Sequence, residues 1–233
     1  MKFPNILASS LVITFLTYPT LFAEPAQTAT EKKVEWKNLL EGENLSQWEK
    51  LDEGSVEDAA AWTITDGVLH LSKTPEMKKK GGSLVTIKHY QNFEMKFEFK
   101  ISEAGNSGVK YRSLKNLGFE FQILDDKKHK DNKNPKNRAG SIYQLVAAPD
   151  DKKINAVGEW NQARIVVQGN SIEHWLNGEK TASLTLGSED WKARYAASKY
   201  KKYPDFGKQG GEILLQDHND EVWFRNLLIR ELK

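Results

Sequence analysis

The chain has 233 residues, no cysteine and a formal net charge of +2 at pH 7. A domain of this size can bury a core without disulfides or metals, and the lack of cysteine excludes disulfides and thiolate metal sites. The nearly balanced charge argues against nucleic acid as a partner.

The first residues have the pattern of a secretory signal peptide. Lys2 supplies a positive charge, a run of apolar and small residues follows, and Ala23 precedes a polar stretch. We therefore expect a signal peptide over residues 1–23, a linker over residues 24–33, and a bacterial protein that is periplasmic or secreted and has no membrane contact after cleavage. An uncleaved anchor is the alternative, but the apolar run barely reaches the roughly 20 residues that a spanning helix needs.

The rest of the chain, residues 34–233, is predicted to form one domain, because no second linker-like stretch appears. Apolar and charged residues alternate strictly over residues 93–101, which is the pattern of a strand with one face in a core and the other in water. Further strands are predicted at residues 62–65, 68–71, 106–112, 118–125, 164–167, 172–176, 212–215 and 222–229.

Turn signals fall between these strands. The dipeptides Asp66-Gly67 and Asn177-Gly178 both suit a type I′ hairpin, which requires positive φ at both central residues. Many short strands with such turns predict an all-β fold, an antiparallel sandwich or barrel. Residues 125–138 and 189–208 lack the alternation and are expected to form short helices or irregular loops.

Polar side chains follow one face of three predicted strands. Alternation sends Glu120 and Gln122 to the face opposite the aromatic residues of their strand. In the same way, Lys110 and Arg112 are expected on the strand face opposite Val109 and Tyr111. Near the end of the chain, Gln216 and His218 are expected to share a face. These polar residues either lie in solvent or form the floor of a site. Amide, carboxylate and guanidinium groups bind sugar hydroxyls, so such a floor predicts a carbohydrate ligand.

Other chemistry is less well supported by the sequence. His129 lies in a loop rich in Lys and Asn that is either solvated or a rim over the floor. His174 alternates with apolar residues, as a packed or edge histidine does more often than a catalytic one. The one candidate cofactor is a hard divalent cation, for which Asp125 and Asp126, with Glu120, are candidate ligands. The histidines have no zinc-binding spacing, and nucleotide, dinucleotide and serine-hydrolase motifs are missing.

Many segments together resemble the 3-keto-disaccharide hydrolase domain family, whose members have a concanavalin A-like fold. The matching segments are residues 39–48, 62–69, 90–94, 105–112, 120–125, 158–161, 174–178, 198–200, 215–218 and 222–226. The resemblance implies a two-sheet antiparallel β-sandwich of the jelly-roll type. It also implies an enzyme that cleaves oxidised glycosides or disaccharides carrying a ketone at C3, by hydrolysis or by elimination followed by hydration.

The implied chemistry assigns provisional roles to the polar residues. A C3 ketone acidifies the C2 proton, so the site needs a general base and a group that stabilises the enolate oxygen. Glu120 or His218 is the expected base, and Arg112, Gln122 or a divalent cation is expected to polarise the ketone. Asn106 and Tyr143 are expected to position the sugar. Lys110, His129 and Gln216 are further candidate substrate-binding residues.

Two positions depart from the family pattern, and one alternative function stays open. Glu212 stands where members often carry His, and Asn219 stands where they usually have Gly, although Asn also tolerates positive φ. A non-catalytic carbohydrate-binding module on the same sandwich is the main alternative, because a fold does not determine a function. A structural or adhesion domain of the cell envelope is a third candidate.

Overall fold

A computed structural model describes residues 35–51, 60–77 and 81–233 of the chain. These described residues form one compact unit. The predicted signal peptide (1–23) and linker (24–33) lie outside the described residues. Within the described part, no helix is long and apolar enough to cross a membrane.

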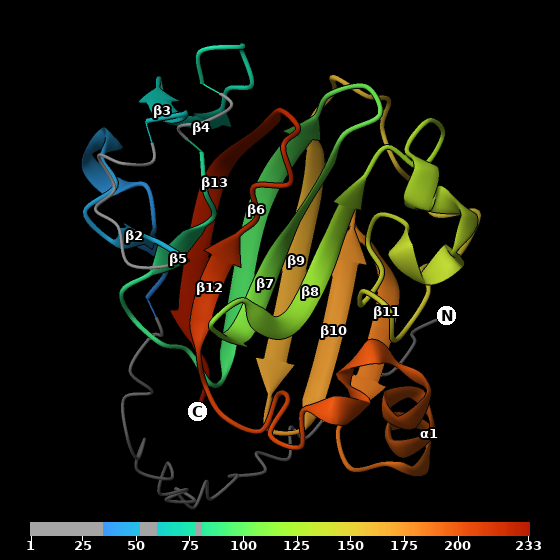
Figure 1. Ribbon diagram of the computed structural model, residues 1–233. Coiled ribbons are helices and arrows are strands. Elements are labelled where there is room, and N and C mark those ends of the chain that lie inside the picture. The colour runs from blue at the N-terminus through green and yellow to red at the C-terminus, as the bar shows by residue number, and fades with distance from the viewer. Residues whose placement is uncertain (1–34, 52–59, 78–80) are drawn as a thin grey trace, which may run out of the picture. The chain divides into compact units, whose positions relative to one another are not determined.

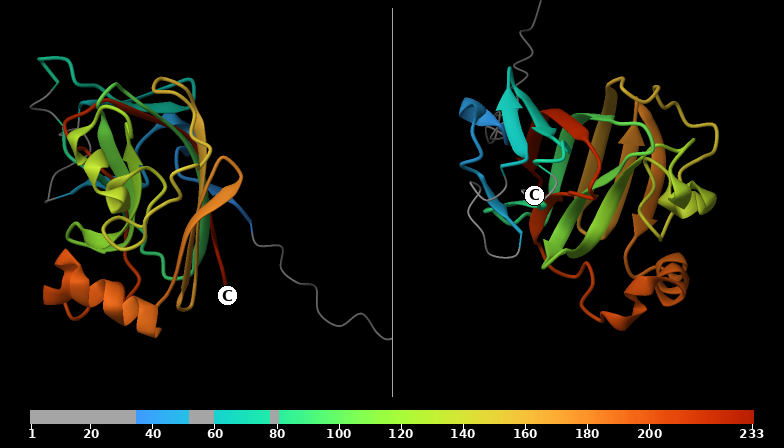
Figure 2. Two further views of the ribbon diagram at one scale, coloured as in Figure 1. Left: turned by 90° about the vertical axis from the view of Figure 1, so that its right-hand side faces the viewer. Right: turned by 45° about the horizontal axis from the view of Figure 1, so that its top comes forward.

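The unit consists of two antiparallel sheets that face each other (Figures 1 and 2). The larger sheet has eight strands: β1 (Lys37–Asn38), β3 (Trp62–Thr65), β4 (Val68–Leu71), β6 (Phe93–Ile101), β9 (Asn161–Gln168), β10 (Ser171–Leu176), β11 (Glu179–Thr185) and β13 (Val222–Glu231). Seven of them run in the order β11-β10-β9-β6-β13-β4-β3, and β1 pairs with β13. The prediction of a two-sheet antiparallel β-sandwich is confirmed.

The smaller sheet has five strands in the order β2-β5-β12-β7-β8. They are β2 (Trp48–Lys50), β5 (Leu84–Thr86), β12 (Glu212–Leu215), β7 (Asn106–Leu114) and β8 (Leu117–Leu124). Short helical turns lie outside the sheets: η1 (Glu41–Glu43), η3 (Lys130–Lys133), η4 (Pro135–Asn137) and η5 (Lys199–Lys202). One α-helix is present in the described part, α1 (Glu189–Ala197). It begins at Ser188, whose hydroxyl accepts a hydrogen bond from the Trp191 amide as an N-cap.

The core lies between the two sheets and is largely aromatic. Phe97 of β6 and Phe121 of β8 meet edge to face across the sandwich, with ring centroids 5.6 Å apart. Such a pair contributes about 1 kcal/mol beyond the area that it buries. Because alternate residues of β7 and β8 enter this core, the intervening residues must lie on the outer face of the smaller sheet.

Both predicted hairpin turns are present. Asp66 and Gly67 have φ angles of 52° and 72°, and Asn177 and Gly178 have φ angles of 47° and 85°. Asn219 has a φ of 69°, so the asparagine adopts the left-handed conformation at the position where the resemblance implies a glycine.

Candidate functional site

Five residues on the outer face of the smaller sheet form what we call the polar floor: Asn106, Lys110, Glu120, Gln122 and Gln216. Gly108 pairs with Gln122 across β7 and β8, and the Gln216 amide donates to the Gly108 carbonyl at 2.9 Å. Gln122 therefore lies on one side of Gly108 and Gln216 on the other. The Gln122 side-chain nitrogen donates to Asn106 Oδ1 at 3.0 Å. The structure thus places these predicted residues together.

The amide oxygens of this floor are incompletely paired. Gln122 Oε1 and Gln216 Oε1 are both buried, and neither accepts a hydrogen bond from another group of the described protein. An unpaired buried acceptor costs about 1–3 kcal/mol. Two such oxygens on one face are ready to accept hydrogen bonds from ligand hydroxyls.

Glu120 is the carboxylic acid of the floor, and it is only 3% exposed. Burial raises its pKa, while the positive charges of Lys110, Lys199 and His218 act in the opposite direction without cancelling the rise. The Lys110 ammonium lies 3.9 Å from Glu120 Oε2 and donates a hydrogen bond to Asn116 Oδ1 at 2.6 Å. A carboxyl group with a raised pKa in such a setting is suited to proton transfer.

Lys199 and Tyr200 join the site from η5, and the alternation of polar and apolar residues along the strands does not predict them. The Lys199 ammonium lies 4.5 Å from the ring centroid of Tyr143 and 5.3 Å from that of Tyr200. Burial lowers the pKa of Lys199, and the charge of Lys110 also lowers it, while Glu120 raises it. Two cations and two phenols therefore surround one carboxyl group.

Tyr143 is placed with the floor, as the resemblance implied. Burial raises its pKa, and the charges of Glu120 and Asp131 raise it further. Its amide donates to the Glu120 carbonyl at 3.0 Å, which fixes the loop after η4 against β8. The phenol is thus held in its protonated form, as a donor.

The rings of the two remaining predicted histidines lie close to each other. The rings of His129 and His218 lie with centroids 6.4 Å apart, His129 buried and His218 exposed. His129 Nδ1 accepts a hydrogen bond from the Asp131 amide at 3.1 Å, as the N-cap of η3. His218 is near enough to Glu120 for its charge to lower that residue's pKa.

Arg112 is not on the polar floor, and the prediction that it shares a face with Lys110 is wrong. The pairing of β7 with β8 shifts register between Tyr111 and Leu114, and Arg112 takes a φ of 45° at this bulge. Strict alternation ends at such a bulge, so the side chain is redirected. Its guanidinium donates instead to the carbonyls of Gln91, Gly169 and Gly207 at 3.0, 2.8 and 3.3 Å.

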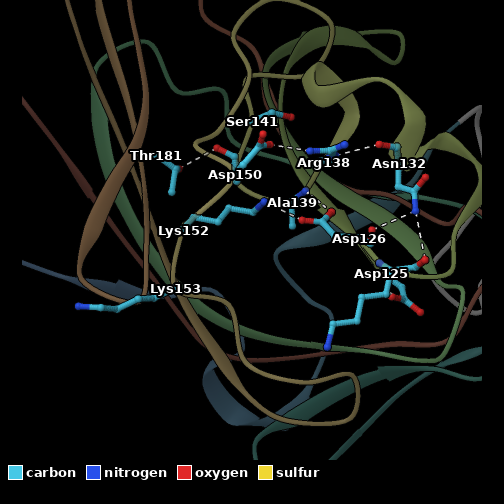
Figure 3. Close-up of polar contacts among 12 residues, drawn as sticks. Asp125, Asp126, Asn132, Arg138, Ala139, Ser141, Asp150, Lys152, Lys153 and Thr181 are labelled. Carbon is cyan, nitrogen blue, oxygen red and sulfur yellow. Dashed lines mark hydrogen bonds and ion pairs between the residues drawn. The ribbon is translucent and has the colours of Figure 1, made fainter.

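Asp125 and Asp126 do not fit the cation site suggested for them (Figure 3). Burial alone would raise the pKa of Asp125, but hydrogen bonds from the amides of Ala104, Lys127 and Lys128 lower it overall. Asp126 accepts a hydrogen bond from the Ala139 amide and pairs with Lys152 at 2.7 Å.

These two carboxylates therefore hold the loop between β8 and η4 in place. Within the described ranges, no group of three or more His, Asp or Glu side chains is arranged to hold a metal ion.

The fold and the polar floor define a carbohydrate-active domain of the glycosyl hydrolase type. Two solved structures from Parabacteroides distasonis, both described as candidate glycosyl hydrolases, are similar to it. One is 31% identical with a TM-score of 0.73, covering 85% of this chain and 94% of that chain. The other is 28% identical with a TM-score of 0.62, covering 85% and 100% respectively.

Comparison of sequences identifies the family within this class of carbohydrate-active domains. The 3-keto-disaccharide hydrolase of Bacteroides thetaiotaomicron is 29% identical in an alignment of 228 positions, gaps included, that covers 83% of this chain and 77% of that protein. The model of the 3-keto-α-glucoside-1,2-lyase-like domain family matches residues 35–230, and the chain belongs to that family.

Proposed function

We propose that this domain cleaves glycosides whose sugar carries a ketone at C3, with Glu120 as the general base. The observation that carries the proposal is one buried carboxyl group of raised pKa beside two ammonium groups and two unpaired amide oxygens. An inverting or retaining glycosidase of the usual kind would need a second carboxylate across the bond. On the polar floor, within the part of the chain that is described, Glu120 is the one carboxylic acid.

The chemistry follows from these groups. Glu120 takes the C2 proton, and the electron pair of that bond forms the enolate, whose negative oxygen at C3 the ammonium groups of Lys110 and Lys199 stabilise. Return of the electrons breaks the bond from C1 to the leaving oxygen, which takes up a proton, and a C1–C2 double bond forms. Water then adds, its hydroxyl to C1 and its proton to C2, so the net reaction is hydrolysis.

The role proposed for Lys110 and Lys199 replaces the one that was expected of Arg112. Their ammonium groups are compact charges on flexible stems, so they can follow the oxygen as charge develops. Gln122 and Gln216 accept hydrogen bonds from sugar hydroxyls, Asn106 holds Gln122 in place, and Tyr143 contributes a donor.

The experiment that tests the proposal compares two substrates. The purified domain should release the aglycone from a 3-keto-glucoside and leave the unoxidised glucoside intact, because only the ketone makes the C2 proton acidic. Release is followed by chromatography. Binding of both sugars without release of either would support the alternative, a carbohydrate-binding module, and would contradict the proposal.

We also propose that the protein is exported to the periplasm or secreted, on the basis of the leader sequence alone. The expected mature chain begins after Ala23. Mass spectrometry of the protein from a cell fraction would establish its first residue and its compartment, and an intact leader in the cytoplasm would contradict the proposal.

Gly108 offers a test of the space around Glu120. A Cβ at this position would lie 2.4 Å from Glu120 Oε1, closer than any real contact allows. Gly108→Ala should therefore displace the carboxyl group and lower kcat about tenfold to a hundredfold, since small misplacements of a catalytic group have effects of this size.

The control for Gly108→Ala is Gly158→Ala, at a turn where nothing lies within 4 Å of the added Cβ. Because Gly158 has a φ of 86°, alanine strains the backbone there but contacts no neighbouring atom. The comparison therefore separates the effect of the clash with Glu120 from the general cost of replacing a glycine. Equal kcat values for the two variants would show that Glu120 does not need the space that Gly108 leaves.

A further inference from the structure

A cavity with a volume of about 640 Å³ lies away from the polar floor. Arg112 lines it together with residues of the turn between β9 and β10, of α1 and of the segment after η5. Neither Glu120 nor any other residue of the polar floor lines this cavity. Its size is typical of a small-molecule site, which spans roughly 300–1,000 Å³.

An aromatic cluster separates the cavity from Glu120. Phe206 lines the cavity and stacks on Tyr200, with ring centroids 4.1 Å apart. Tyr200 lies on the Glu120 side, where the charge of Glu120 raises its pKa in addition to the larger effect of burial. The two sites therefore share a wall, and a ligand in the cavity does not need to touch the polar floor.

Arg112 brings an uncompensated positive charge to this cavity. The residue is 3% exposed, and its main hydrogen-bond acceptors are three backbone carbonyl oxygens. Among the residues that the structure describes, no carboxylate forms an ion pair with it. Carbonyl oxygens satisfy N–H groups but leave the net charge in place, and a buried charge without a counter-ion is costly. An anionic ligand would supply the missing charge.

Part of the guanidinium is still able to donate. Nη1 carries two N–H groups and makes one hydrogen bond, to the Gly207 carbonyl at 3.3 Å. The second hydrogen bond of Nη2, to Asn92 Oδ1, is long at 3.5 Å and is easily exchanged for a better acceptor. A carboxylate accepts two parallel N–H groups of a guanidinium, so it matches what Arg112 offers.

The other walls indicate what carries the carboxylate. Trp191 and Tyr195 of α1 supply aromatic surface, and Gln91, Asn92 and Asn170 supply amide groups. Aromatic rings bind the apolar face of a sugar ring, while amides bind its hydroxyls. We propose that this cavity is a second ligand site that binds an acidic sugar, a hexuronate, with its carboxylate on Arg112.

The test changes one charge in the cavity and leaves Arg112 intact. Asn170 is exposed and lines the cavity, and its side chain makes no hydrogen bond within the described protein. Asn170→Asp brings a negative charge into the cavity and should weaken D-glucuronate binding about tenfold or more, whereas the neutral Asn170→Ser should change it less than about threefold. Binding is measured by isothermal titration calorimetry and by the change in tryptophan fluorescence.

Three further measurements make the outcome decisive. D-glucose should bind at least about tenfold more weakly than D-glucuronate, since it lacks the charge-assisted contact. Benzoate should also bind more weakly, because it lacks hydroxyls for the amides. Gln122→Ala removes an acceptor for sugar hydroxyls from the polar floor and should leave D-glucuronate binding unchanged, which separates this cavity from the floor.

The proposal fails if D-glucuronate does not bind, or if Asn170→Asp and Asn170→Ser bind it equally. Equal binding of glucose would show that the charge of Arg112 is not used. Benzoate binding more tightly than the sugar would assign the cavity to aromatic acids instead.

Discussion

Glu120→Gln is expected to lower kcat for a 3-keto-glucoside by about 10²- to 10⁴-fold, the usual contribution of a positioned general base. Glutamine has nearly the same shape as glutamate but cannot take a proton from C2. KM should change by less than about threefold, since the amide oxygens of Gln122 and Gln216 that are assigned to sugar hydroxyls are retained. The measurement is steady-state release of the aglycone.

The matched control is Glu212→Gln. Glu212 is the first residue of β12 in the smaller sheet, and it is half-buried. Burial raises its pKa and the charge of Glu49 raises it further, while the charge of His89 lowers it. It is not part of the polar floor, so its variant should keep kcat within about twofold. A Glu120→Gln enzyme with unchanged kcat would remove Glu120 from the mechanism, and His218 would then be the remaining candidate base.

The pH dependence of the same enzyme gives an independent signature of Glu120. Its carboxyl must be ionised to act as a base, and burial raises its pKa above the usual 4.5. kcat/KM should therefore fall as the pH is lowered through this raised pKa, at a higher pH than an ordinary glutamate would give. The fall in kcat/KM at low pH reflects protonation of Glu120 in the free enzyme. The Glu120→Gln variant should therefore not show this acidic limb of the pH–rate profile.

The sequence predicted the parts of this molecule that depend on simple alternation. The strict pattern over residues 93–101 matches β6, and the alternation of Phe119 and Phe121 with Glu120 and Gln122 assigns the faces of β8 correctly. Hairpin signals were equally reliable, because few residues tolerate positive φ at two successive positions. His174 was predicted to be a packed or edge histidine rather than a catalytic one, and it is fully buried.

Other features depend on contacts that no local pattern contains. The bulge at Arg112 depends on how β7 pairs with β8 near their hairpin turn at Lys115 and Asn116. The identities of these two turn residues do not indicate that the alternation of β7 already ends at Arg112. Lys199 and Tyr200 come from a helical turn some eighty residues after Glu120, so only the folded chain brings them to it. The resemblance covers the segment 198–200 but gives it no role.

His174 should make the stability of the protein depend strongly on pH. Its ring is fully buried between the sheets, where Nδ1 donates to the Ser141 carbonyl at 3.1 Å and Nε2 accepts from the Tyr111 hydroxyl at 2.8 Å. Both nitrogens are thus used by the neutral ring. Burial lowers the pKa of His174 from 6.5 to about 3, against smaller opposing effects of the Ser141 and Gly140 carbonyls.

The sign of the effect follows from which state takes up the proton. Below pH 6.5 the unfolded chain protonates His174, whereas the folded protein does so only near pH 3. The free energy of unfolding should therefore fall as the pH is lowered from 6.5 toward 3, by up to about 1.4 kcal/mol per pH unit from this one group. Above pH 6.5 the contribution is constant, because the ring is neutral in both states.

His174→Gln should remove this dependence and also lower stability at neutral pH by about 1–3 kcal/mol, since the ring contacts of His174 with Tyr111 and Phe121 in the core are lost. Urea unfolding of both proteins at a series of pH values gives the difference curve, in which the titration of all other groups cancels. His89→Gln is the control: its side chain is 56% exposed, so the curve should keep the slope of the original protein. The difference in the free energy of unfolding between the two proteins could instead be constant between pH 6.5 and 3. His174 would then take up its proton as readily in the folded protein as in the unfolded chain. In that case the neutral hydrogen-bonded pair of His174 and Tyr111 could not be what holds the two sheets together at this point.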